Sequence, residues 1–357
     1  MIFWILNLNS YRWKCFMGLF NRFKKGSLIK KAYKLFTQSK YQEALKCYNE
    51  ILEMDPEDMD ICYNKGVVLE RLGRLNDALK VYDRVLKKDP YHILACHNKS
   101  VILSNLGKYQ DALLLYDKTL ELNSNHFDAA YNKGKVFNIL KRYNQALESF
   151  DRALEIDPND SGACDSRGFA LVKLGKYYEA LKSFDRALEI DPGYVHALYN
   201  KGCVLDKLGK YQEAIENYDA ALKIDPNHIN AWHNKGYALD KLEKYQEAIE
   251  NYDKGLKIDH KDSELLYNKG NSLMELGNYQ NAIENYDKSL EINPKSHYAW
   301  DNRGIALGKL GKYHEALKSY DKALKINPKH INAWCNKGDI LVDIGKDQEA
   351  LNVLKKP

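Results

Sequence analysis

The 357-residue sequence contains none of the short motifs that mark the common enzyme classes. It has no phosphate-binding loop, no GxGxxG and no HExxH, because His314-Glu315 is not followed by a second histidine. We therefore expect neither catalytic activity nor a bound cofactor. With catalysis not expected, binding to another molecule is the remaining class of function.

The seven cysteines include no CxxC pair, so the sequence indicates neither a disulfide framework nor a zinc site. We expect free thiols, which suit a reducing compartment and favour a cytoplasmic location. Histidines recur singly at His92, His126, His228 and His330. One histidine per segment cannot form a chelate, so we predict no metal site.

No linker rich in proline, glycine or serine divides the sequence after residue 24, so we expect one elongated domain. Positive charge is concentrated at the start, since residues 1–42 contain nine bases and no acid. The remainder carries 45 bases and 49 acids, a net charge of −4. Because this remainder shows no clear basic stripe, we predict that nucleic acid is not a partner.

A pattern that begins with Asn-Lys-Gly at residues 64–66 returns every 34 residues. A fixed period of this length is typical of a solenoid, in which each repeat packs on its neighbours. Ser100 fills the one gap in the glycine series. The glycines in register are Gly66, Gly134, Gly168, Gly202, Gly236, Gly270, Gly304 and Gly338.

The repeat at residues 59–92 predicts two amphipathic helices. Its apolar residues recur at helical spacing on both sides of Gly73, which lies where a left-handed helix C-cap is needed. Asp89-Pro90 is expected to end the second helix. Each repeat is therefore predicted to be a helical hairpin.

Only one or two residue types occur at two positions of the second helix. The Ala78 position is alanine in every repeat, and the Tyr82 position is tyrosine or phenylalanine in the complete repeats that follow. With a proline at the Pro90 position of several repeats and Trp232, Trp300 and Trp334 in the first helix, the pattern resembles the tetratricopeptide repeat. The alanines are Ala78, Ala112, Ala146, Ala180, Ala214, Ala248, Ala282, Ala316 and Ala350.

The resemblance implies an all-α fold, a right-handed α-solenoid of stacked helix-turn-helix units. We expect the array to cover residues 25–357, with nine complete repeats and a truncated tenth, and with Ser39 in place of the glycine between the helices of the first repeat. Residues 1–24 form a basic, aromatic segment outside the repeats. Either Met17 is the true start, or residues 1–34 dock on a membrane surface.

One departure from the family pattern is a base before each glycine of the series, from Lys65 to Lys337, where the family has leucine. A lysine stem covers apolar surface while its ammonium group reaches water. We therefore predict that this basic column is a solvated face.

Helical geometry places Asp60, Asn64, Val67 and Arg71 on the side of the first helix opposite Cys62. The resemblance to tetratricopeptide arrays implies that the first helices line a concave groove. The Asn64 position is almost constant, with Ser166 as the exception, whereas its neighbours differ freely between repeats. An amide can donate to and accept from the backbone of an extended peptide. The predicted ladder is Asn64, Asn98, Asn132, Asn200, Asn234, Asn268, Asn302 and Asn336.

This column resembles the asparagine ladder in the tetratricopeptide superhelix of O-linked N-acetylglucosamine transferases. The alternative is that each asparagine bonds a backbone group of the adjacent repeat and serves only to brace the stacking. The Tyr63 position lies beside the column and runs Tyr, His, Tyr, Asp twice, so that Tyr63, Tyr131, Tyr199 and Tyr267 are further candidates for peptide contact.

We therefore expect a non-enzymatic scaffold that binds an extended segment of a partner protein. The alternatives are a detached or regulatory repeat domain of a separate enzyme, such as a glycosyltransferase, and an assembly factor at a membrane surface. Ile340, Leu351 and Leu354 are expected to lie uncovered in the last repeat. We expect either self-association through this repeat or fraying of residues 331–357. The sequence identifies neither the partner nor the oligomeric state.

Overall fold

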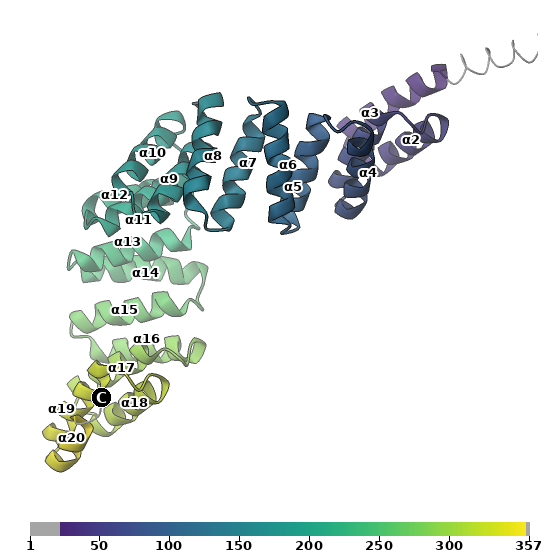
Figure 1. Cartoon of the computed structure of the whole chain (residues 1–357). Coiled ribbons are helices and arrows are strands. Elements are labelled where there is room, and N and C mark those ends of the chain that lie inside the picture. The colour runs from purple at the N-terminus through teal and green to yellow at the C-terminus, as the bar shows by residue number, and fades with distance from the viewer. Residues whose placement is uncertain (1–21, 355–357) are drawn as a thin grey trace, which may run out of the picture. The chain divides into compact units, whose positions relative to one another are not determined.

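The computed structural model describes residues 22–354, which belong to two compact units, residues 22–159 and residues 160–354. In each unit, successive helices are joined by short turns and pack side by side (Figure 1). The described residues contain no strand, which confirms the all-α expectation.

In the first unit, residues 22–37 are helical. The following helices are α2 (Tyr41–Met54), α3 (Met59–Arg71), α4 (Leu75–Lys88), α5 (Ile93–Asn105), α6 (Tyr109–Leu122), α7 (Phe127–Ile139) and α8 (Tyr143–Ile156).

The second unit begins with α9 (Ser161–Lys173), α10 (Tyr177–Ile190), α11 (Val195–Lys207), α12 (Tyr211–Ile224), α13 (Ile229–Lys241) and α14 (Tyr245–Ile258). It continues with α15 (Ser263–Glu275), α16 (Tyr279–Ile292), α17 (His297–Lys309), α18 (Tyr313–Ile326), α19 (Ile331–Asp343) and α20 (Asp347–Leu354).

The hairpin of α3 and α4 confirms the prediction for residues 59–92. Asp58 caps α3 by accepting a hydrogen bond from the backbone N–H of Ile61 at 3.0 Å. Gly73 has a φ of +71°, the left-handed conformation that ends α3, and Ser39 adopts the same conformation at 58°. The second helix ends at Lys88, directly before Asp89-Pro90.

The glycine series exists because an aromatic ring of the second helix lies against the first. A Cβ added at Gly66 would be 2.5 Å from a ring carbon of Tyr82. Phe150, Phe184, Tyr218, Tyr252, Tyr286 and Tyr320 crowd the later glycines in the same way. These rings are fully or almost fully buried, as are the alanines of the Ala78 position.

The tyrosine hydroxyls at this contact reach carboxylates on the first helix. Tyr218 Oη donates to Asp206 Oδ2 at 2.5 Å, and Tyr252 Oη donates to Asp240 Oδ2 at 2.6 Å. Asp206 Oδ1 is buried and has no hydrogen-bond partner among the described residues. Burial raises the pKa of Asp206 to about 6, although the bond from Tyr218 acts in the opposite direction.

The basic column is not a solvated face, so that prediction is wrong. In seven repeats the base pairs with the aspartate that follows the aromatic residue of the preceding repeat, at 2.5–2.7 Å. The pairs are Lys99–Asp83, Lys133–Asp117, Lys201–Asp185, Lys235–Asp219, Lys269–Asp253, Arg303–Asp287 and Lys337–Asp321. Each partly exposed pair joins adjacent repeats and contributes about 0–1 kcal/mol.

The last repeat differs in one residue from expectation. Ile340 is not uncovered: only 7 % of its surface is exposed, and it packs with Tyr320 and Leu307 of the preceding repeat. Val342 and Leu351 are about half exposed, and the side chain of Leu354 lies outside the described residues. Self-association through this repeat stays a prediction.

Ala214→Leu should destabilise the chain, because Ala214 has no exposed surface and packs with Tyr218, Leu205 and Leu222. Overpacking at such a site costs about 1–3 kcal/mol. Urea unfolding followed by circular dichroism measures the loss. Ala220→Leu, at a half-buried position of the same helix, is the matched control. Equal stability of Ala214→Leu and the parent would contradict this packing argument.

Asp206→Asn should remove part of the pH dependence of stability. The folded pKa of Asp206 is about 6, above the value of about 3.9 for an unfolded chain, so the folded state binds more protons between these values. The contribution of Asp206 to the free energy of unfolding therefore increases as the pH falls from 6 to 4.

Urea unfolding at pH 4.5 and pH 7 should show the parent gaining stability relative to Asp206→Asn at the lower pH. Glu216→Gln on the exposed side of α12 serves as control and should show no such gain. A difference between parent and Asp206→Asn that is the same at both pH values would exclude this role for Asp206.

Candidate functional site

The candidate site is the Asn face, which we define as the side of each first helix that carries Asn64 or its equivalents. In α3 the opposite side, with Cys62 and Leu69, is buried, whereas Asp60 and Arg71 are exposed. Asn64 and every other predicted ladder residue are half-buried. The structure thus places the predicted column along one face within each unit.

Six ladder amides form hydrogen bonds with the residue at the Tyr63 position of the preceding repeat. The amide nitrogen of each lies 2.6–3.2 Å from its partner. The pairs are Asn98 with Tyr63, Asn200 with Asp165, Asn234 with Tyr199, Asn268 with His233, Asn302 with Tyr267, and Asn336 with Asp301. These bonds join adjacent repeats, as the brace interpretation expects, but their partners are side chains and not the expected backbone groups.

The six hydrogen bonds between repeats, which we call braces, leave part of each amide available for a ligand. All six bonds use the nitrogen, so the carbonyl oxygen Oδ1 is not engaged in them. An asparagine side chain has two N–H donors and an oxygen with two lone pairs. Asn234 and Asn302 each make a second contact through the nitrogen, to Cys203 and Asn271 respectively. An amide can therefore brace the stacking and still accept a hydrogen bond from a peptide.

The three residue types at the Tyr63 position share one chemical property. Tyrosine, histidine and aspartate look dissimilar, but each offers an acceptor to the amide of the next repeat. Burial raises the pKa of Asp165 and of Asp301, and the amide bonds from Asn200 and Asn336 favour the ionised carboxylates.

Two ladder residues depart from this arrangement. For Asn64 the corresponding earlier residue is Ile29, which has no side-chain acceptor. For Asn132 it is His97, whose Nδ1 is buried without a partner among the described residues. Burial lowers the pKa of His97 to about 4, and the neighbouring His126 ring, 4.6 Å away between centroids, adds to the effect.

The four candidate tyrosines are half-buried and keep ring surface on this face. The rings of Tyr63 and Tyr199 pack on His92 and His228, at centroid distances of 5.0 and 4.7 Å. Tyr131 stacks on Phe127, and the Lys135 ammonium lies 5.4 Å from the Tyr131 ring centre. Tyr267 lies 6.0 Å from Tyr286.

The recurring histidines have a role that sequence reasoning missed. Nδ1 of His92, His126 and His228 accepts a hydrogen bond from the backbone N–H three residues later, at 3.1–3.2 Å. They therefore cap the following helices. The signal was available, because the same position holds Asp58, a preferred capping residue. Residues 22–354 contain no cluster of metal-ligating side chains.

Two cavities open on this face in the second unit, and Asn268 lines both. The larger, of about 300 Å³, is also lined by Ser263, Glu264, Tyr267, Ser289, Asn293, Ser296 and Tyr298. The smaller, of about 180 Å³, is also lined by Tyr237, Asp240, Lys241, Tyr245, Asn271, Ser272 and Glu275.

Three solved structures illustrate what the chain is similar to. YrrB, described as a TPR protein with an unusual peptide-binding site, is 28 % identical, and the match covers 53 % of this chain and 97 % of YrrB with a TM-score of 0.46. MamA of Desulfovibrio magneticus RS-1 is 21 % identical, and the match covers 48 % of this chain and 96 % of MamA with a TM-score of 0.46. The pilF protein of Pseudomonas aeruginosa is 18 % identical, and the match covers 61 % of this chain and 97 % of pilF with a TM-score of 0.52. No curated protein matches the chain.

Family comparison agrees with the helical hairpins. A sequence model described as tetratricopeptide repeat matches residues 127–160, 166–194, 195–228, 229–262, 263–296 and 297–330. Three further models of the same description match residues 29–93, 93–128 and 319–352. The first model alone matches more than half of the sequence, and the chain therefore belongs to the tetratricopeptide repeat family.

Proposed function

We propose that the chain is a non-enzymatic scaffold that binds an extended peptide segment of a partner protein along the Asn face. The observation that carries the proposal is the set of ladder amides in consecutive repeats of one unit. Asn200, Asn234, Asn268, Asn302 and Asn336 belong to residues 160–354, and the carbonyl oxygen of each is left out of the inter-repeat bonds.

An extended peptide presents backbone N–H groups at regular intervals, which amide oxygens on successive repeats can accept. The braces support this use, because a side chain already held by the preceding repeat loses less rotamer freedom on binding. Recognition of the backbone carries little sequence preference. The tyrosines and the variable residues of the Asn face then supply the selectivity.

We also propose a reducing location such as the cytoplasm. The six cysteines in the described residues are free thiols, as a reducing compartment favours. Cys47, Cys62, Cys96 and Cys164 are buried, Cys203 is partly buried and Cys335 is exposed. Within residues 22–354, none of the helices has the length and apolar character needed to cross a bilayer.

Two double variants separate peptide binding from bracing. Asn234→Ala/Asn302→Ala removes two braces and two ladder amides, whereas Tyr199→Phe/Tyr267→Phe removes the two tyrosine acceptors but keeps the amides. A net hydrogen bond contributes about 0.5–1.5 kcal/mol, so the asparagine variant should bind a labelled pool of random ten-residue peptides roughly 5- to 150-fold more weakly. Fluorescence anisotropy measures the affinity.

The tyrosine variant should bind the pool almost as well as the parent, although both variants should melt at a lower temperature by circular dichroism. Equal peptide affinity in the parent and both variants would mean that the asparagine column only braces the repeats. No binding of the pool by the parent would overturn the proposed function.

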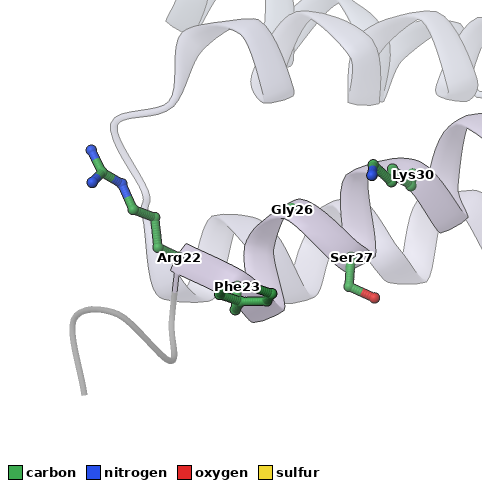
Figure 2. Close-up of a pocket in the computed structure, with 5 residues that line it drawn as sticks. All are labelled: Arg22, Phe23, Gly26, Ser27 and Lys30. Atoms are coloured by element: carbon green, nitrogen blue, oxygen red, sulfur yellow. The ribbon is translucent and has the colours of Figure 1, made fainter. Parts of the chain in front are cut away.

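A second candidate is docking on an anionic membrane surface through the helix at residues 22–37. Phe23 and Tyr33 are 84 % and 68 % exposed there, among the exposed bases Lys30, Lys31 and Lys34. Figure 2 shows Arg22, Phe23, Ser27 and Lys30 around a surface cavity of this helix. Exposed aromatic rings among bases suit the interface of an anionic bilayer. Residues 1–21, the rest of the predicted membrane segment, lie outside the described residues.

Flotation with vesicles tests this candidate. The chain should float with phosphatidylcholine vesicles that contain phosphatidylserine and not with pure phosphatidylcholine. Lys30→Glu/Lys34→Glu should reduce the floated fraction strongly, because each base near such a surface contributes roughly 1 kcal/mol. Lys223→Glu/Lys257→Glu, with the same charge change at exposed positions elsewhere, should float like the parent. Flotation of all variants alike would exclude this helix as the docking element.

A further inference from the structure

We propose that the two cavities beside Asn268 accept cationic side chains, so that the segment bound there is a basic extended peptide. This inference rests on the proposed function and adds the chemical class of the ligand. Its basis is the lining of the cavities at α13, α15 and the turn before α17.

The larger cavity combines a carboxylate with aromatic and hydroxyl groups. Glu264 is exposed at its edge and Tyr267 and Tyr298 contribute rings, while Ser263, Ser289 and Ser296 contribute hydroxyls. No lysine, arginine or histidine lines it. An ammonium or guanidinium group that enters can lie on a tyrosine ring and reach the Glu264 carboxylate, a combination that attracts cations.

In the smaller cavity one cation of the chain already lies on a tyrosine ring. The Lys241 ammonium lies 5.0 Å from the centre of the Tyr237 ring, within the range of a cation–π contact. Asp240 in its wall accepts hydrogen bonds from Tyr252 and Ser272, both at 2.6 Å. Glu275 and Tyr245 complete the lining with an exposed carboxylate and a second ring.

Charge favours a basic over an acidic peptide. Three carboxylates, Glu264, Asp240 and Glu275, face the two cavities, against the single ammonium of Lys241. An acidic side chain at either place would meet like charge, which is unfavourable. The partly open position of the cavities leaves room for a long flexible side chain.

Asn268 couples the cavities to the ladder. Its amide nitrogen lies 2.6 Å from His233 Nε2, and its side chain lines both cavities. A peptide backbone that bonds to this amide therefore passes between them. In an extended chain, alternate side chains point to the same side. A sequence with a base at every second residue presents its cations toward this face together.

The test uses the full chain and three fluorescein-labelled ten-residue peptides, (Lys-Gly)5, (Ser-Gly)5 and (Glu-Gly)5, in fluorescence anisotropy at 150 mM salt. We expect (Lys-Gly)5 to bind at least about tenfold more tightly than (Ser-Gly)5, and (Glu-Gly)5 to bind most weakly. Glu264→Gln/Glu275→Gln should reduce the preference for (Lys-Gly)5 about tenfold. Glu250→Gln/Glu284→Gln, with the same charge change on α14 and α16 away from both cavities, should keep it.

Several outcomes would overturn the inference. Equal weakening of (Lys-Gly)5 by both glutamate pairs would show attraction by overall charge only. Similar binding of all three peptides, still weakened by Asn234→Ala/Asn302→Ala, would remove the basic selectivity and leave the proposed function intact. Binding of none of the three peptides, together with no binding of the random pool, would remove both.

Discussion

The contact between a glycine of the first helix and an aromatic ring of the second determines the rest of this structure. Because Gly66 has no Cβ, the Tyr82 ring lies directly on the backbone of α3, and the same contact recurs in later repeats. It does more than fill space. It carries the Tyr82 hydroxyl through the hairpin to the Asn face, where it meets Asn98 of the next repeat at 3.3 Å. Packing within a repeat thus prepares the polar contact between repeats.

Most of the hairpin was predictable from the sequence because its signals are local. The helical spacing of apolar residues, Gly73 and Asp89-Pro90 all occur within one repeat, and they predict the structure of that repeat alone. The family comparison and the structure agree with them. Lys141 and Glu243 also adopt the left-handed conformation between helices, at φ of 58° and 60°. The residue types at these two positions do not indicate the left-handed conformation. Only the repeat register predicts a turn there.

The candidate site was harder to predict because its partners are distant in sequence. In seven repeats the base pairs with an aspartate 16 residues earlier, and in six the ladder amide bonds to a residue 35 positions earlier. Periodicity identifies each column but not which column faces which. The sequence therefore predicts a solvated face for the basic column and does not decide between the two roles of the asparagine column. The structure assigns the inter-repeat contacts, and both roles remain chemically compatible.

The bond between Asn98 and Tyr63 has an evolutionary consequence. At six junctions between repeats, the residue at the Tyr63 position of one repeat accepts a hydrogen bond from the ladder amide of the next repeat, and this acceptor can be a phenol, an imidazole or a carboxylate. A duplication or deletion of a whole repeat therefore joins a standard donor to an adequate acceptor. A change by any other number of residues would break both the amide bond and the ion pair at the junction. The array is thus free to lengthen or shorten, but only in whole repeats.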